Sequence, residues 1–217
     1  MSDGSLIVST TTLAGFAAVA LAMVLTPGPN MAYLVSRTIC HGRAAGLVSL
    51  GGIGTGFIVY VLLAAFGLTA LIFAVPLAYD VLRIAGAVYL GWMAWGALKP
   101  GGASPFQLRN LPADSRRRLF SMGLLTTLLN PKAAALYLSL LPQFIDPAAG
   151  HILAQTLILG LTQVSISLTV NTLIVLTAGA VSAFLSGRPF WTLVQRWLMG
   201  TVLAGLAIRM AIGTGRR

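Results

Sequence analysis

The sequence contains no glutamate and only four aspartates among its 217 residues. It has one cysteine, Cys40, which excludes an intramolecular disulfide and a thiolate metal cluster. Charged residues make up 8% of the chain, whereas soluble domains carry about 25%. So few charged side chains cannot coat a soluble domain, and lipid is the expected solvent over most of the surface. The composition therefore predicts an integral membrane protein.

The chain has 14 lysines and arginines, and its formal net charge is +10. Such a charge can indicate nucleic-acid binding, but a membrane protein also carries basic residues beside its spans, where they set its orientation. We therefore expect lipid and no nucleic acid as a partner. The first residues, "MSDGSLIVSTTT", lack the basic start of a cleaved signal peptide, so the first apolar run is expected to stay in the mature protein.

Apolar runs of about 20 residues, the length of a transmembrane helix, occur six times in the chain. They cover residues 13–36, 46–66, 77–98, 119–141, 152–176 and 190–210. The runs are continuously apolar and do not alternate as the strands of a membrane barrel do, so they predict helices. A hydrophilic linker, 99–118, divides a first three-helix repeat (1–98) from a second (119–217) within a single membrane domain.

The charges of the linker predict its side of the membrane. Lys99, Arg109 and the run 116–118 are basic, so the linker is expected in the cytoplasm. Counting spans outward then places both termini outside the cytoplasm. Arg209 and the two C-terminal arginines are exceptions to the rule in this topology.

Weak internal similarity supports the division into two repeats. Gly46-Leu47 and Gly160-Leu161 open the second and fifth runs, 114 residues apart, and Gly86 and Gly200 have the same offset. Three spans per repeat would orient the repeats oppositely in the membrane, an arrangement typical of transporters. The predicted fold class is an all-α integral membrane protein with six transmembrane helices as two inverted three-helix repeats, in which helices one and four are broken.

The first break is "TPGPN" (26–30), in the middle of the first run. Pro27, Gly28 and Pro29 should interrupt the helix, and Asn30 adds a polar side chain. In lipid such a break is tolerated only against protein or a watery cavity. The half-helix that starts near Asn30 would point free N–H groups inward, which suits a carboxylate. The alternative is an ordinary loop between two spans.

The second break lies in the fourth run, where Asn130 and Pro131 are followed by Lys132. A lysine about 13 residues into a span, or roughly 20 Å at 1.5 Å per residue, is costly unless it has a function. Lys132 is a candidate ligand of a substrate carboxylate and a candidate group for proton coupling. The alternative is a lysine that extends to the membrane surface because its helix starts later.

Two other groups of residues leave their role open. The fifth run is rich in polar residues that could line a pathway or form hydrogen bonds between helices: Thr162, Gln163, Ser165, Ser167, Thr169, Asn171 and Thr172. Three tyrosines could be interfacial or could line a pocket: Tyr60, Tyr89 and Tyr137. The glycines of "LGGIGTGF" are expected to allow close helix packing.

Several motifs together resemble the LysE-type amino-acid exporters, including their RhtB-like homoserine/threonine branch. These motifs are "TPGPN" (26–30), "GLVSLGGIGTG" (46–56), "GAVYLGWMAWG" (86–96), "LLNPKAAALYLSLLPQF" (128–144) and "MGTVLAGLAIRMA" (199–211). The resemblance implies a small inner-membrane protein that exports amino acids or related metabolites with the proton-motive force. It gives functional weight to Pro27, Gly28, Pro29, Asn30, Asn130, Pro131, Lys132, Gln143 and Phe144. Asn171 stands where an aromatic residue is expected.

These observations predict a secondary transporter that exports a small zwitterion by proton antiport. Lys132 and the helix end at Asn30 would bind its carboxylate, and Asn30, Asn130 and Asn171 would contact its amine. The lack of buried carboxylates favours a neutral amino acid over lysine or arginine. No catalytic residue, cofactor or resident metal is expected, and the glycine-rich second run permits a homodimer without requiring one.

Three alternatives belong to other functional classes. A divalent-metal exporter, a function of distant relatives of such folds, would need more oxygen, histidine or cysteine ligands than this chain offers. An intramembrane enzyme would need paired aspartates or a serine–histidine pair at one depth. The third alternative is a structural or assembly subunit that transports nothing, and the two predicted helix breaks are only weak evidence against it.

Overall fold

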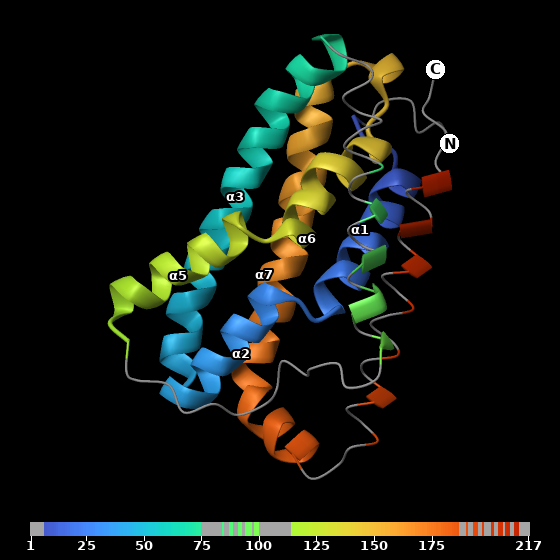
Figure 1. The fold of residues 1–217 in the computed structure, drawn as a ribbon. Helices are drawn as coiled ribbons and strands as arrows, with labels where there is room; N and C mark the ends of the chain where they lie inside the picture. Colours follow the sequence, from blue (N-terminus) through green and yellow to red (C-terminus); the bar gives the residue numbers. More distant parts are fainter. Residues whose placement is uncertain are drawn as a thin grey trace.

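The structure is a computed structural model that describes residues 7–74 and 114–186 continuously and scattered positions within 84–99 and 190–212. All regular secondary structure in these residues is helical (Figure 1). The predicted all-α class is confirmed to this extent. The predicted spans 77–98 and 190–210 and most of the linker lie outside the continuously described residues, so the six-helix count and the inverted repeat stay predictions.

The first predicted span consists of two helices with a break between them. α1 (Thr10–Leu25) starts after Ser9, whose hydroxyl accepts a hydrogen bond from the Thr12 N–H at 3.1 Å. α2 (Pro29–His41) starts with a proline, which needs no N–H partner at the first position of a helix. The axes of α1 and α2 differ by 52°. The predicted break at residues 26–30 is therefore present.

Two uninterrupted helices correspond to the second and fifth predicted spans. α3 (Arg43–Ala74) and α7 (Ile152–Ser186) contain apolar stretches of 25 and 27 residues, Arg43–Gly67 and Ile152–Ala178. Both stretches are long enough to cross a membrane. The predicted runs 46–66 and 152–176 are thus confirmed as helices of spanning length.

The fourth predicted span is also interrupted. α5 (Arg116–Leu128) ends before Asn130, and α6 (Pro131–Ala134) continues as a π-helix (Ala135–Leu140) and a 3₁₀ turn (Leu141–Phe144). The bend between α5 and the segment Lys132–Phe144 is 56°. A further 3₁₀ turn, Pro147–Ala149, leads into α7. With each bent pair counted as one span, the described residues hold four membrane-spanning candidates.

Glycines bring the backbones of α3 and α5 into contact. A Cβ atom added to Gly52 would lie 2.0 Å from the Phe120 carbonyl oxygen, and one added to Gly123 would lie 2.4 Å from the Ser49 carbonyl oxygen. No larger residue fits at these positions without a shift of backbone. The prediction that the glycines of the second run serve packing is confirmed at Gly52.

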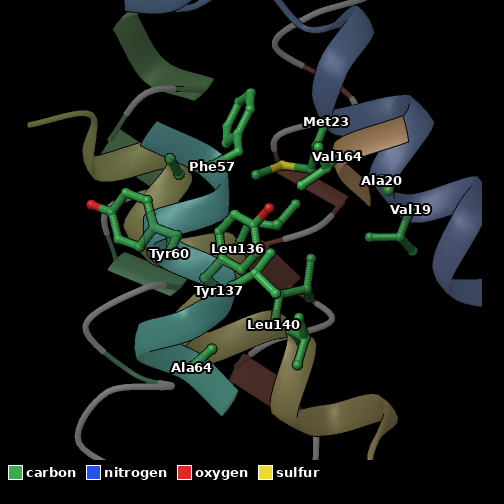
Figure 2. Packing of buried hydrophobic residues seen from close by; sticks show 14 of the residues in the cluster. Val19, Ala20, Met23, Phe57, Tyr60, Ala64, Leu136, Tyr137, Leu140 and Val164 are labelled. Atoms are coloured by element: carbon green, nitrogen blue, oxygen red, sulfur yellow. The ribbon is translucent and has the colours of Figure 1, made fainter. Parts of the chain in front are cut away.

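An aromatic cluster forms the core beside these helices. The rings of Tyr60 and Tyr137 stack with centroids 5.4 Å apart, and Phe57 lies 6.3 Å from Tyr137. Figure 2 shows the three rings gathered within the buried cluster. The Tyr60 hydroxyl donates to the Leu128 carbonyl at 2.8 Å, next to the second break. Tyr60 and Tyr137 are therefore core residues, and Tyr89 lies outside the described residues.

A buried ion pair ties α2 to the start of α5. The Arg37 guanidinium contacts the Asp114 carboxylate, and the side chains of these two residues are 11% and 2% exposed. Arg118 also contacts Asp114, at 3.1 Å, but its side chain is 66% exposed. The Arg37 guanidinium lies 5.5 Å from the centroid of the Tyr33 ring, and the Tyr33 hydroxyl donates to the Leu119 carbonyl at 2.7 Å.

Candidate functional site

The two helix breaks line one cavity together with the middle of α7. In Figure 1 the turns between α1 and α2 and between α5 and α6 both lie beside α7. The lining residues are Met23, Val24, Thr26, Gly28, Asn30, Met31, Phe57, Asn130, Lys132, Ala133, Leu136, Gln163, Ser167 and Asn171. The structure thus brings together five residues that the sequence singled out for binding: Gly28, Asn30, Asn130, Lys132 and Asn171.

Lys132 connects the second break to the first. Its ammonium donates a hydrogen bond to the Thr26 carbonyl at the C-terminal end of α1. A cation is favoured there because the free carbonyls of a helix C-terminus carry partial negative charge. A Cβ atom added to Gly28 would lie 3.3 Å from Nζ and 3.4 Å from Cδ of Lys132, so the glycine makes room for the lysine chain.

Asn130 stabilises the start of the half-helix that carries Lys132. Its Oδ1 accepts a hydrogen bond from the Lys132 backbone N–H at 3.0 Å, and its own N–H bonds to the Thr127 carbonyl at 3.0 Å. A side chain of this type commonly occupies the position before a helix. This arrangement gives Asn130 a capping role beside its place in the cavity wall.

Asn30 presents an unsatisfied acceptor. It is 8% exposed, and its Nδ2 donates to the Thr127 hydroxyl at 3.1 Å. Its Oδ1 is buried and has no hydrogen-bond partner in the part of the chain that the structure describes. Buried polar atoms nearly always have partners, so an orphan acceptor in a cavity wall indicates a place for a ligand donor.

The polar residues of α7 divide into two groups. Gln163, Ser167 and Asn171 follow one another at four-residue spacing, which puts them on one helix face, and all three line the cavity. Asn171 Nδ2 donates to the Ser167 carbonyl at 2.8 Å, and Gln163 accepts from the Tyr137 hydroxyl. Thr162 and Ser165 belong to the second group, which does not line the cavity, and they donate to the Ile158 and Leu161 carbonyls at 2.7 and 2.9 Å.

The remaining predicted site residues lie around the cavity or apart from it. Pro27 lies in the first break, and Pro29 and Pro131 are the first residues of α2 and α6. Gln143 and Phe144 are absent from the lining: Gln143 Nε2 donates to the Ser139 carbonyl at 2.9 Å, and Phe144 packs edge-on against Phe16. Whether any of these residues binds substrate stays a prediction.

Several lining residues were not singled out from the sequence. Met23, Met31, Phe57 and Leu136 give the cavity apolar walls. A helix that faces lipid on one side and protein on the other is apolar all round, so periodicity does not mark the side that faces a cavity. Thr26 could have been identified from the sequence. It directly precedes the proline pair, and this position predicts that its carbonyl lies at the end of a helix.

The charge and size of the cavity limit what it can bind. Lys132 is the one ionisable side chain among the lining residues that the structure describes. The cavity volume is about 40 Å³, and because one water needs about 10–15 Å³, there is room for about three waters. The only charge that these lining residues can carry is therefore positive, and the cavity must widen to take anything larger than a few waters.

Comparison with known proteins assigns the chain to a family. Residues 21–214 match the family described as LysE type translocator. The chain is 34% identical to the homoserine/homoserine lactone efflux protein of Salmonella typhimurium, over 75% of this chain and 78% of that protein. It is 30% identical to the leucine efflux protein of Klebsiella pneumoniae, over 88% of this chain and 91% of that protein. No solved structure matches. The chain is a multi-pass membrane protein that belongs to the LysE type translocator family.

Proposed function

We propose that the protein exports a small neutral amino acid from the cytoplasm, as a proton antiporter of the bacterial inner membrane. The observation that carries this proposal is the cavity at the two helix breaks, where the Lys132 ammonium and the start of α2 meet without a carboxylate among the lining residues described. Interrupted helices with free ends at one site are the usual construction of a transporter binding site.

The substrate carboxylate would bind between Lys132 and the N-terminus of α2. Pro29 has no N–H, and the Ala32 N–H is bonded to the Gly28 carbonyl, so the N–H groups of Asn30 and Met31 are the ones left without a partner within the helix. These groups carry partial positive charge and are suited to an anion. Lys132 would exchange its bond to Thr26 for a bond to the carboxylate.

The substrate ammonium would bind to Asn30. Its Oδ1 is the buried acceptor that lacks a partner, and a protonated amine is a strong donor. The side chain of the substrate would then lie against the apolar walls formed by Met23, Met31 and Phe57. A second cationic group would have no counter-charge among the lining residues that the structure describes, which favours a neutral substrate over lysine or arginine.

The relatives agree with this substrate class. Their names give leucine and homoserine, or its lactone, as the exported compounds. Leucine and homoserine are both neutral amino acids, with a carboxylate, an ammonium and an uncharged side chain, whereas the lactone keeps the amine but has no free carboxylate. We therefore propose that the cargo of this chain is of the same class.

Export requires the cavity to widen and to open to each side in turn. We propose that this occurs by movement at the two breaks, whose bends of 52° and 56° are similar, within a six-helix architecture of two inverted repeats. Lys132 is the candidate for the group that takes up and releases the coupling proton. Both termini would lie outside the cytoplasm.

Counterflow in proteoliposomes tests this proposal. Vesicles with the purified protein are preloaded with one unlabelled amino acid, and entry of the same labelled compound is followed with and without an imposed pH gradient. We expect accelerated exchange for neutral amino acids and none for lysine or arginine, and acceleration by the gradient if protons are coupled. Folded protein that exchanges no amino acid would contradict the proposal.

Divalent metal ions would then be tested as the exported species. The described residues, however, contain no group of three histidine, cysteine or aspartate side chains placed to bind a metal ion.

A further inference from the structure

We propose that Thr127 is a positioning residue that makes the cavity specific for a ligand that donates hydrogen bonds, such as the ammonium of an amino acid. The inference rests on the proposed function, because Thr127 acts through Asn30, the residue assigned to the substrate ammonium. Thr127 lies in the last turn of α5, is fully buried and does not line the cavity. It therefore lies behind Asn30 and would not touch a substrate.

The hydroxyl of Thr127 has a single proton, and that proton is in use. It is donated to the Gly123 carbonyl, one turn earlier in α5, at 3.0 Å. The oxygen of the hydroxyl is then left only as an acceptor. Asn30 is bonded to this oxygen at 3.1 Å and must therefore offer it an N–H of its amide group, Nδ2.

This bond determines which end of the Asn30 amide is available to a ligand. An amide has donors on its nitrogen and an acceptor on its oxygen. With Nδ2 held by Thr127, the oxygen is the atom left without a partner among the described residues. The reverse orientation would expose N–H groups, which attract a carboxylate and repel an ammonium. Thr127 thus determines whether Asn30 accepts or donates a hydrogen bond to the ligand.

The packing of Thr127 allows its hydroxyl to be removed without loss of its hydrocarbon contacts. A Cβ atom added to Gly56 would lie 2.6 Å from Cβ and 2.8 Å from Cγ2 of Thr127, so α3 packs against the carbon atoms of this side chain. Valine keeps both carbons and replaces the hydroxyl by a methyl group. Serine keeps the hydroxyl.

The test measures discrimination between a substrate and its analogue without an amino group. Exchange of labelled L-leucine is competed with unlabelled L-leucine and with 4-methylpentanoate, and exchange of labelled L-homoserine with L-homoserine and 4-hydroxybutanoate. The readout is a ratio, the inhibition constant of the analogue divided by that of the amino acid. This ratio is large when the ammonium contributes to binding. We expect Thr127→Val to lower this ratio on the order of tenfold, the size expected for a hydrogen bond to a charged group. Thr127→Ser should keep it.

The matched control is Thr156→Val. Thr156 is also fully buried, and its hydroxyl also donates to a carbonyl one turn earlier, that of Ile152, at 2.8 Å, but it does not line the cavity. This variant should leave the ratio unchanged. In an Asn30→Ala background, Thr127→Val should have no further effect on the ratio, since the two residues act as one unit.

An unchanged ratio in folded Thr127→Val protein would overturn the inference, as would an equal loss in Thr156→Val. If Thr127→Val does not fold, Thr127→Ala removes the same hydroxyl and carries the same expectation. Failure of the proposed function would give a different result, because the wild-type protein would then exchange neither leucine nor homoserine. That result would contradict both the proposed function and the role of Thr127.

Discussion

The ammonium of Lys132 donates a hydrogen bond to the Thr26 carbonyl, 106 residues earlier in the chain. The bond joins the second helix break to the end of α1, so each interrupted span supplies a group that the other span lacks. A carbonyl at the end of a half-helix would otherwise face the membrane interior without a donor. The site is therefore built from both parts of the chain.

Substitution of Lys132 by methionine should strongly weaken the apparent affinity of exchange for its substrate. Methionine keeps much of the length of the side chain but removes the charge that we assign to the substrate carboxylate. A hydrogen bond to a charged group contributes about 1.5–3 kcal/mol, so the apparent affinity should fall on the order of tenfold or more. The measurement is the substrate dependence of counterflow. Lys99, the only other lysine, provides the control Lys99→Met, which should behave as wild type. Full transport by folded Lys132→Met protein would remove this lysine from the mechanism.

Substitution of Gly28 by alanine should weaken transport through Lys132. Gly28 has an extended backbone, with φ of −159° and ψ of −174°, which alanine adopts without strain. The added Cβ atom would, however, lie 3.3 Å from the lysine Nζ, which must shift by a few tenths of an ångström. We expect a loss of apparent affinity of about two- to tenfold, which corresponds to at most about 1.4 kcal/mol. Thermal stability should change little, because the atoms that must move belong to the end of a flexible lysine side chain and not to the backbone. Gly67→Ala is the control, because nothing lies within 4 Å of its added Cβ. An equal effect in both variants would contradict this account.

Two adjacent glycines in α3 should differ in their tolerance of alanine. A Cβ atom at Gly52 would lie 2.0 Å from the Phe120 carbonyl oxygen, whereas one at Gly51 would lie 3.7 Å from the Phe120 ring. Gly52→Ala should therefore separate α3 from α5 and destabilise the protein by about 1–3 kcal/mol or more, as other overpacked cores do. Gly51→Ala should be neutral. Thermal unfolding in detergent compares the two variants, and equal unfolding temperatures would show that the contact between α3 and α5 is looser than described.

The predicted orientation can be tested with single cysteines in a Cys40→Ser background. Ser115 precedes α5, beside the basic linker, and Ala149 lies in the turn before α7, and both residues are exposed. A membrane-impermeant maleimide should label Ala149→Cys in intact cells and Ser115→Cys only in inside-out vesicles. The basic residues around position 115 and the lack of basic residues between 142 and 150 support this orientation. The opposite labelling pattern would reverse the proposed direction of every span.

The positions of the helices were predictable because lipid imposes a simple rule on the sequence. Apolar runs of sufficient length marked α3 and α7, and the proline pair at residues 27 and 29 and the single Pro131 marked the two breaks. Helix lengths were less accurate, since α3 continues to Ala74 and α7 to Ser186. Hydropathy does not show where an apolar helix leaves the membrane.

The details of the site were only partly predictable. Lys132, Asn30 and Asn130 stand out because a polar residue beside a proline is unusual within an apolar run. Their partners do not stand out. The Thr26 carbonyl is a backbone group that is invisible in sequence, and Thr127 is one of many threonines in apolar segments. The π-helix at Ala135–Leu140, which contains the fully buried Tyr137, has no sequence signal either.

The separation of the paired groups along the chain has a consequence for biosynthesis. Asn30 bonds to Thr127 and Thr26 to Lys132, over 97 and 106 residues. A ribosome that adds about 5–20 residues per second needs roughly 5–20 s to make that length of chain. During this interval the first bent helix has a polar side chain and a free carbonyl without their final partners. The newly made N-terminal half must therefore be sheltered from lipid, by the insertion machinery or by water, until α5 and α6 have been added.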